Sequence, residues 1–549
     1  MPASPSDTHD VFNQPPPLPT LNAVEADPVL IGALDHALDA ETETSLIAHG
    51  AFWGSFEARE LARLATSVSP VLSTHDAQGR RIDQIEHHPA YHALMRRSSE
   101  AGIAVPPVAV HGPANAHAGL LRTARLFVTA QTEPGHLMGL VSTHAVGPLL
   151  DRLPDAHTET WTSGVATRRY DHRPVEASAK AGLTLSLAIT EKQGGIEPID
   201  SATRTRVLPT GLHQVTGHKW FVTNPASDGS VILAESSNGP SALLVPRLKA
   251  DGAMNATYLM RLKHTLGLKA TTIGEVEYAN AEAILIGDEG EGAVLLSQAT
   301  DRLRLDIATI ACGQMRAALA HAVHHCKHRT AGGERLIDLD LMTRVLADMT
   351  IDVAAATVLV MRLSAAADGA RYDPLEAAFF RLVLPAAKYW ISKTAIAIAA
   401  ESLECTGGNG FVEQGGMPQF HRDAIGLSLW AGPGNVLAAD LLKVLDDDAQ
   451  ALHAVIDELS DELGRDGTVS ADVIRAAAAA CQEDRGSARI LIEQLALASA
   501  AAALHRYAPR AITAAFIDTR LSGPWRMSYG MLDSRHDCAG IVDYAFQGL

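Results

Sequence analysis

The spacing of hydrophobic residues changes character twice along the chain. From about residue 41 to residue 170, apolar residues recur every three to four positions, as in Ser55–Leu64, which predicts amphipathic helices. From Leu183 to Ile189 the period shortens to two, because leucine or isoleucine alternates with small or polar residues, which is typical of a strand. After Gly290 the helical period returns and continues almost to the last residue.

This order of elements predicts an α+β protein built from separate helical and β domains. Helices are expected at 291–328, 338–368, 374–405 and 433–446, and strands at 183–189, 215–223, 231–234, 243–246 and 274–278. The predicted domains are an arm at 1–40, a helical domain at 41–182, an antiparallel β domain at 183–287, a helical bundle at 288–445 and a helical region at 446–549.

Composition narrows the functional classes. The 549 residues are 47% hydrophobic and 20% charged, which describes a folded globular protein. A net charge of −18 disfavours general affinity for nucleic acid, because phosphate binding needs a positive surface. No apolar stretch is expected to span a membrane, and the polar, proline-rich start has no signal-peptide pattern. Five scattered cysteines favour reduced thiols in a cytoplasmic protein.

Two short segments in the β region carry candidate cofactor chemistry. Thr190–Gly195 reads Thr-Glu-Lys-Gln-Gly-Gly directly after a predicted strand, and its glycines would let a bulky cofactor approach the backbone. Trp220–Thr223 places aromatic rings beside a hydroxyl, a combination that suits a flat heterocycle. Taken alone, the first segment is also compatible with a simple β-turn and the second with an aromatic pair in the core.

Two further glycine-rich segments lie in the helical bundle. Gly407 and Gly408 follow a predicted helix, where they could equally form a plain C-terminal cap. Trp430–Asn435 reads Trp-Ala-Gly-Pro-Gly-Asn and opens another helix, whose free amides suit a phosphate or another anion.

The order of these motifs, together with Arg422-Asp423-Ala424, resembles the acyl-CoA dehydrogenase family from about residue 40 to residue 445. The Thr190–Gly195 string, the Gly217–Phe221 run, the start Phe12–Pro15 and the C-terminal extension resemble the AidB-like branch. The resemblance implies an N-terminal helical domain, a central β-barrel domain and a C-terminal four-helix-bundle domain, followed by the extra helical region.

The resemblance also implies FAD bound between the β domain and the helical bundle. The residues implied to contact FAD are Thr190, Gln193, Gly194, Gly195, Phe221, Val222, Thr223, Gly407, Gly408, Trp430, Gly432, Gly434 and Asn435. Arg329 matches an arginine that reaches an FAD phosphate from a neighbouring subunit, so a homotetramer is expected. Ile196 and Gly332 depart from the family pattern, and each removes one expected cofactor contact.

The catalytic base implied by the resemblance is missing. Ala431 occupies the usual glutamate position, and Leu303, just before Arg304, occupies the alternative one. Asp301 and Asp306 are close in sequence, but they are expected to point in other directions around the helix. We therefore assign no catalytic residue.

The expected function is an FAD-dependent oxidoreductase with non-standard chemistry, such as oxidase or hydroxylase chemistry, on a small-molecule acyl or similar substrate. One alternative is a residual acyl-CoA dehydrogenase. Another is an AidB-like, DNA-associated protective protein whose flavin is structural.

Two other features are better explained by solvent-exposed helix surfaces. The run His324–His328 suggests metal binding, but consecutive helical residues cannot easily converge on one ion, so no metal is expected. Residues 446–549 contain 16 acidic and nine basic residues, a net charge of −7. Lys443 and Arg520 resemble basic positions of the AidB-like branch, which keeps nucleic acid as an alternative partner.

Overall fold

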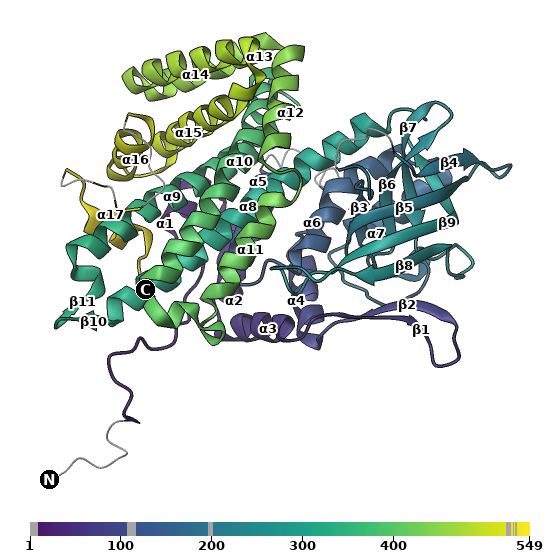
Figure 1. Cartoon of the computed structure of the whole chain (residues 1–549), viewed down its shortest axis with the longest axis horizontal. Helices are drawn as coiled ribbons and strands as arrows, with labels where there is room; N and C mark the ends of the chain where they lie inside the picture. The colour runs from purple at the N-terminus through teal and green to yellow at the C-terminus, as the bar shows by residue number, and fades with distance from the viewer. Residues whose placement is uncertain (1–8, 107–116, 196–200, 523–528, 531, 533–534) are drawn as a thin grey trace.

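A helix of 37 residues, α8 (Gly292–His328), is the axis of the molecule. The computed structural model describes residues 9–106, 117–195, 201–522, 529–530, 532 and 535–549. Helices surround α8 along most of its length, and a β domain lies at one end of the helical part (Figure 1). This is the acyl-CoA dehydrogenase-like α+β arrangement that the sequence predicts.

The N-terminal part is mainly helical. Its helices are α1 (Pro28–Leu34), α2 (Ala40–Trp53), α3 (Phe56–Ser67), α4 (Pro89–Glu100), α5 (Ala118–Ala130), α6 (Leu137–Val146) and α7 (Asp155–Ala166). The prediction of a helical domain at 41–182 does not include the hairpin formed by β1 (Val71–His75) and β2 (Arg81–Glu86). The turn between them, closed by Asp76 and Gly79, interrupts the helical period, and the flanking residues alternate as strands do.

The β domain closes into a small barrel. Its strands are β3 (Leu185–Ala188), β4 (Arg204–Val207), β5 (His213–Thr223), β6 (Gly229–Ser236), β7 (Gly239–Pro246), β8 (Thr257–Leu262) and β9 (Ile273–Ile286). The pairing order β6-β4-β5-β9-β7 returns to β6. The expectation of a purely antiparallel domain is wrong, because β3 pairs with β6 in parallel. Sequence periodicity identifies strands but carries no information on their relative direction.

The predicted bundle helices are present with nearly the predicted bounds. After α8 come α9 (Asp340–Gly369), α10 (Pro374–Cys405), α11 (Met417–Leu429) and α12 (Gly434–Asp447). The sequence prediction omits α11. A two-strand hairpin, β10 (Thr330–Ala331) and β11 (Glu334–Arg335), follows α8, and a short 3-10 turn, η8 (Gly407–Phe411), follows α10.

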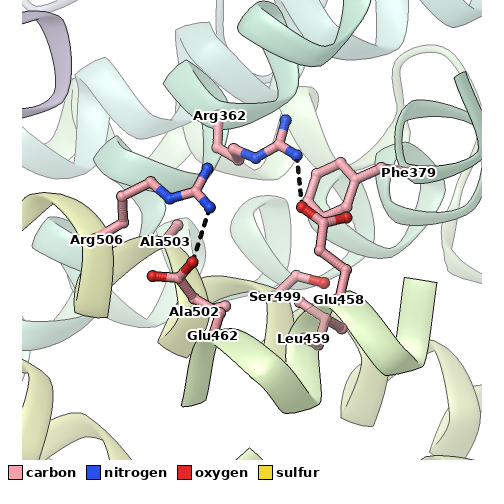
Figure 2. A pocket seen from close by; sticks show the side chains of 9 residues that line it. All are labelled: Arg362, Phe379, Glu458, Leu459, Glu462, Ser499, Ala502, Ala503 and Arg506. Atoms are coloured by element: carbon pink, nitrogen blue, oxygen red, sulfur yellow. Dashed lines mark hydrogen bonds and ion pairs between the residues drawn. The ribbon is translucent and has the colours of Figure 1, made fainter. Parts of the chain in front are cut away.

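The last hundred residues form a helical layer on the bundle. They contain α13 (Ala449–Leu463), α14 (Arg465–Glu483), α15 (Ala488–Tyr507), α16 (Arg510–Phe516) and α17 (Cys538–Ala545). Figure 2 shows the charged side chains at this junction: Arg362 of α9 pairs with Glu458 of α13 at 3.0 Å, and within the layer Arg506 of α15 pairs with Glu462 of α13 at 2.7 Å. The cavity between these pairs, about 20 Å³, has room for little more than water.

Three helical stretches are long and apolar enough to cross a membrane by length and composition, which contradicts the expectation from sequence. The most apolar of them coincides with α9, whose 18-residue window is 94% buried inside the protein. Its apolar residues therefore pack against neighbouring helices.

A buried lysine fixes the turn that links α11 to α12. The Lys388 side chain, on α10, is fully buried, and its Nζ donates to the carbonyl oxygens of Ser428 at 3.1 Å and Gly432 at 2.8 Å. One ammonium thus holds both ends of the turn. Burial, reinforced by repulsion from Arg304 and Lys393, lowers the pKa of Lys388 to about 7.

We expect Lys388 to leave a signature in the pH dependence of stability. Above about pH 7 the native chain releases a proton that the unfolded chain keeps up to about 10.5, so the free energy of unfolding rises across that interval. Urea unfolding of wild type and Lys388→Met from pH 6 to pH 10 measures the difference. The rise should be absent from Lys388→Met and present in Lys393→Met, an exposed lysine on the same helix. Parallel curves for wild type and Lys388→Met would contradict this assignment.

Arg520 anchors the C-terminal layer. Its guanidinium contacts Asp352 at 3.0 Å and Asp348 at 2.8 Å, and its side chain is only 10% exposed. Both carboxylates belong to α9 and are themselves buried.

Replacing Arg520 with leucine should therefore cost about 3–5 kcal/mol, because two buried carboxylates lose their partner. Arg535, whose side chain is 69% exposed and pairs distantly with Asp518, is the matched control. Arg535→Leu should change the free energy of unfolding by no more than about 0.5 kcal/mol. Chemical denaturation of the two variants checks this, and equal losses would refute the anchoring role.

Candidate functional site

The two motif segments of the β domain lie together. The backbone amide of Trp220 donates to the carbonyl oxygen of Thr190 at 2.8 Å, which places the Thr190–Gly195 segment beside β5. Within that segment the Glu191 amide donates to the Gly194 carbonyl at 2.9 Å and closes the turn. The sequence therefore folds these segments, about thirty residues apart, into one surface.

A buried ion pair locks that surface. Lys219 Nζ lies 2.7 Å from Glu191 Oε1, and both side chains are almost fully buried. Burial would raise the pKa of Glu191, but hydrogen bonds and attraction from Lys219 outweigh it and hold that pKa well below its usual range. The glutamate is thus an ionised acceptor, and it also accepts from Ser201 Oγ at 2.7 Å and Gln193 Nε2 at 2.6 Å.

The outer side of this surface is open. Phe221 is 49% exposed although it lies on a strand, whereas Val222 and Thr223 are buried. A Cβ added at Gly195 would meet no atom within 4 Å. An exposed ring beside a backbone without side chains is the arrangement that a flat heterocycle needs. Ile196 lies outside the described residues.

A cavity of about 390 Å³ begins where this surface ends. Ile189, the residue before Thr190, lines it together with Leu233 of β6. The remaining walls come from α8, α10 and α12, so the cavity lies between the β domain and the helical bundle. Its bundle-side lining is Ala293, Leu296, Ser297, Thr300, Asp301, Arg304, Arg381, Pro385, Val436, Asp440, Lys443, Val444 and Asp447.

The turn that lacks the glutamate adjoins this cavity. Ala431 adopts φ +56, a left-handed conformation that is unusual for a residue with a Cβ, and it is buried. Its carbonyl oxygen accepts from Arg304 Nε at 3.1 Å, and Arg304 also lines the cavity. Gly432 has φ +110, and a Cβ there would lie 3.2 Å from Val436 Cγ1.

The remaining predicted contacts in this turn face different surroundings. Trp430 ends α11 and packs partly against the core. A Cβ at Gly434 would meet Tyr389 of α10 at 3.1 Å, and the Asn435 side chain accepts from Arg489 of α15 at 2.8 Å. These two residues thus connect α12 to α10 and to the C-terminal layer.

Arg329, Gly407 and Gly408 form a second group. Arg329 Nη1 donates to the carbonyl oxygen of Asn13 at 2.5 Å, and Gln14 Oε1 accepts from Asn409 at 3.0 Å. The N-terminal arm therefore links the end of α8 to the turn after α10. Gly407 has φ +61 and follows the C-cap of α10, so it does cap the helix, and open space surrounds both glycines.

Asn13 makes the docking of the arm specific. Its side-chain amide donates to the Thr330 carbonyl at 2.9 Å and accepts from the Thr330 amide at 2.7 Å, as a neighbouring strand would. Farther along the arm, His324 Nε2 lies 2.9 Å from the Pro16 carbonyl oxygen.

The group of Arg329, Gly407 and Gly408 lies far along the bundle from the Thr190 surface and the turn at Ala431. Arg304 and Arg329 are separated by roughly 37 Å along α8, at about 1.5 Å per residue. Figure 1 shows the β10–β11 hairpin at the end of the helical part away from the β domain. The sequence prediction placed Gly407 and Gly408 with the Trp430–Asn435 turn, whereas the structure brings them to Arg329.

One expectation about the carboxylates of α8 is wrong. Asp301 does line the cavity, whereas Leu303 packs in the core. Asp301 is three residues before Arg304, so the two lie on one helix face. Asp306 is indeed turned elsewhere: it is fully buried and bound by Arg122 at 2.5 Å and His144 at 3.0 Å.

The sequence analysis did not identify two residues near the turn, Lys388 and Asp440. A lysine within the apolar run 382–391 is an anomaly that could have been noticed. Asp440, which pairs with Arg304, offers no comparable signal because α12 is amphipathic.

Lys443 and Arg520, the residues that keep nucleic acid as an alternative, have acidic partners, and so do other basic residues of the C-terminal layer. Arg485 pairs with Asp446 at 2.5 Å and Lys443 with Asp440 at 3.3 Å, besides the pairs of Arg506 and Arg520 described above. Among the residues with a described position, no group of three or more potential metal ligands was found.

Comparisons with known proteins agree with this architecture. Residues 13–172 match the adaptive response protein AidB N-terminal domain, and residues 290–445 match the acyl-CoA dehydrogenase C-terminal domain. The putative acyl-CoA dehydrogenase AidB of Escherichia coli (strain K12) is 36% identical over 459 residues, covering 84% of each chain. Acyl-CoA dehydrogenase family member 11 of Caenorhabditis elegans is 27% identical over 484 residues, 82% of this chain and 75% of that protein.

A solved structure has the same fold. Caenorhabditis elegans ACDH-11 in complex with C11-CoA aligns with a TM-score of 0.81 at 22% identity, covering 96% of this chain and 97% of that one. Because the matched domains and the AidB relative together span most of the sequence, this chain belongs to the acyl-CoA dehydrogenase family, in its AidB-like branch.

Proposed function

We propose that this protein is an FAD-dependent oxidoreductase that takes an acyl thioester, or a substrate of similar shape, into the cavity between the β domain and α8, α10 and α12. The observation that carries the proposal is the cavity itself. It joins Ile189, next to the Thr190 motif, to Arg304, which holds the turn at Ala431. The substrate class is supported by the C11-CoA complex of ACDH-11 and by family membership.

The residues present fit a flavin. Thr190, Phe221 and the glycines at 194–195 offer a hydroxyl, a half-exposed ring and an accessible backbone on one surface. A crystal structure of an acyl-CoA dehydrogenase from Bacillus anthracis with the same fold contains FAD. When bound, the flavin would supply the electron acceptor, and the protein would orient the substrate and keep water out of the cavity.

A second copy of the chain would complete the cofactor site. Arg329, Gly407 and Gly408 are too far from the Thr190 surface for one extended ligand to contact both groups of one chain. Beside them Phe12 is 82% exposed and Phe411 is 83% exposed, as expected of rings that a neighbouring subunit covers. We therefore include a homotetramer in the proposal.

Nucleic acid binding is not included. Arg520 and Lys443, which suggested it, are paired with carboxylates, and the C-terminal region is acidic overall. A phosphate backbone would have to compete with these pairs.

Restoring a carboxylate at position 431 tests the proposed chemistry. We expect Ala431→Glu to accelerate anaerobic reduction of the bound flavin by acyl-CoA at least about tenfold, because a positioned base typically contributes 10²–10⁴-fold. Loss of the flavin absorption band in stopped-flow experiments measures the rate. Ala431→Gln, with the same length and no basic oxygen, is the control; if acyl-CoA reduces the flavin in none of wild type, Ala431→Glu and Ala431→Gln, the proposed substrate class is contradicted.

Arg329 tests the shared cofactor site. Replacement by methionine should weaken FAD binding by roughly 10–100-fold, the loss of one charge-assisted hydrogen bond, measured by titration of flavin-free protein. Arg335→Met, in the hairpin that follows Arg329 but paired with Asp338 at 2.7 Å, should bind FAD as wild type does. Unchanged FAD affinity in Arg329→Met would remove Arg329 from the site, and wild-type protein that binds no flavin would refute the cofactor itself.

A further inference from the structure

One face of α8 forms a wall of the cavity. The α8 residues in that wall are Ala293, Leu296, Ser297, Thr300, Asp301 and Arg304. Their spacing alternates between three and one, so they form a single stripe along the helix. The stripe begins with two apolar side chains, continues with two hydroxyl groups and ends in a carboxylate and a guanidinium. Arg304 also binds the Ala431 carbonyl, so this charged end is the part of the wall next to the turn.

Three carboxylates line the cavity, and they differ in their partners. Asp440 is paired with two cations, Arg304 and Lys443. Asp447 is exposed and lies near the end of α12. Asp301 accepts one hydrogen bond, from Arg304 Nη1 to Oδ1 at 3.0 Å, and its side chain keeps 37% of its surface exposed. Among the described residues, its Oδ2 has no hydrogen-bond donor.

We propose that Asp301 supplies the carboxylate base that position 431 lacks, and that it removes a proton from the α-carbon of an acyl thioester in the cavity. This inference rests on the proposed function and adds to it the residue that performs the proton transfer. The oxygen available for the transfer is Oδ2, because Oδ1 is held by the guanidinium of Arg304.

The electrostatics of the site agree with this role. Burial raises the pKa of Asp301, although attraction to Arg304 opposes the rise. A carboxylate that binds a proton more readily is a better base near neutral pH. Arg304 meanwhile remains bound to Asp440 and to the Ala431 carbonyl, so it can stay in place while Asp301 takes up a proton.

The proton transfer is balanced without an oxidant. The C–H bond at the α-carbon breaks, an O–H bond forms on Asp301, and the electron pair stays on the thioester as its enolate. Return of a proton from Asp301 to the same carbon restores the substrate. In heavy water the Asp301 proton exchanges with solvent, so deuterium accumulates at the α-carbon.

The test uses 3-thiaoctanoyl-CoA, in which sulfur replaces the β-carbon, so that no β-hydrogen can leave and only proton exchange is observed. Flavin-loaded full-length protein is incubated with this compound in heavy water, and deuterium at the α-carbon is followed by NMR. We expect Asp301→Asn to slow exchange at least about 100-fold, within the range for a general base. Asp301→Glu, which keeps a carboxylate, should retain measurable exchange.

Asp440→Asn is the matched control, because it removes the other carboxylate that binds the same guanidinium. It should slow exchange at least about tenfold less than Asp301→Asn does, because it disturbs the shared guanidinium but leaves the proposed base in place. Equal losses in D301N and D440N would mean that Asp301 only positions Arg304, and this would overturn the inference, as would exchange at the wild-type rate in D301N.

Calorimetric binding of the same compound separates failure of this inference from failure of the proposed function. Wild type that does not bind it refutes the proposed substrate class, whereas wild type that binds it without exchange refutes the role of Asp301 alone. Exchange in D301N is compared with exchange in wild type at a saturating concentration of the compound. If D301N no longer binds the compound, exchange in D301E tests the role of Asp301 instead. Binding without exchange in D301E would count against that role.

Discussion

Two buried basic side chains hold the backbone of one turn, and the candidate site depends on that restraint. Lys388 binds the carbonyls of Ser428 and Gly432, and Arg304 binds the carbonyl between them, that of Ala431. These bonds tie α8, α10 and the α11–α12 connection to a common point. They also give a physical reason why Ala431 keeps a left-handed backbone, which costs a residue with a Cβ roughly 1–2 kcal/mol. The geometry of the turn is therefore imposed from outside it.

The sequence predicted the elements well where periodicity was strong. The bounds expected for α8, α9, α10 and α12 lie within about two residues of those observed, because their hydrophobic periodicity is strong and, at α10, Asp373 caps the first turn. It failed for α11, which is short and begins inside a glycine-rich region, and for the β1–β2 hairpin, which interrupts a helical domain. The parallel pairing of β3 with β6 depends on chain topology, which no local pattern encodes.

The candidate site shows a similar division. The order of the motifs identified the family and predicted that Thr190 and Phe221 share one surface. It did not predict which residues distant in sequence are in contact. Gly407 joins Arg329 through the N-terminal arm, a contact over more than 300 residues that no spacing rule contains. The sequence does not show that Asp301 faces the cavity, because Leu303 lies in the core and the cavity face of α8 is the one that carries Arg304.

The restraint on the turn also explains how the family's glutamate position can hold alanine without loss of the site. Lys388 and Arg304 bind only main-chain oxygens there, so no bond of theirs depends on the side chain at 431. Replacing a glutamate with alanine would remove a base but leave the anchoring contacts, the path of the backbone and the neighbouring cavity unchanged. The reaction is then decided by whichever other polar groups the cavity presents. Because Arg304 belongs both to the anchor and to the cavity wall, a carboxylate paired with it is held in position by the contacts that shape the turn.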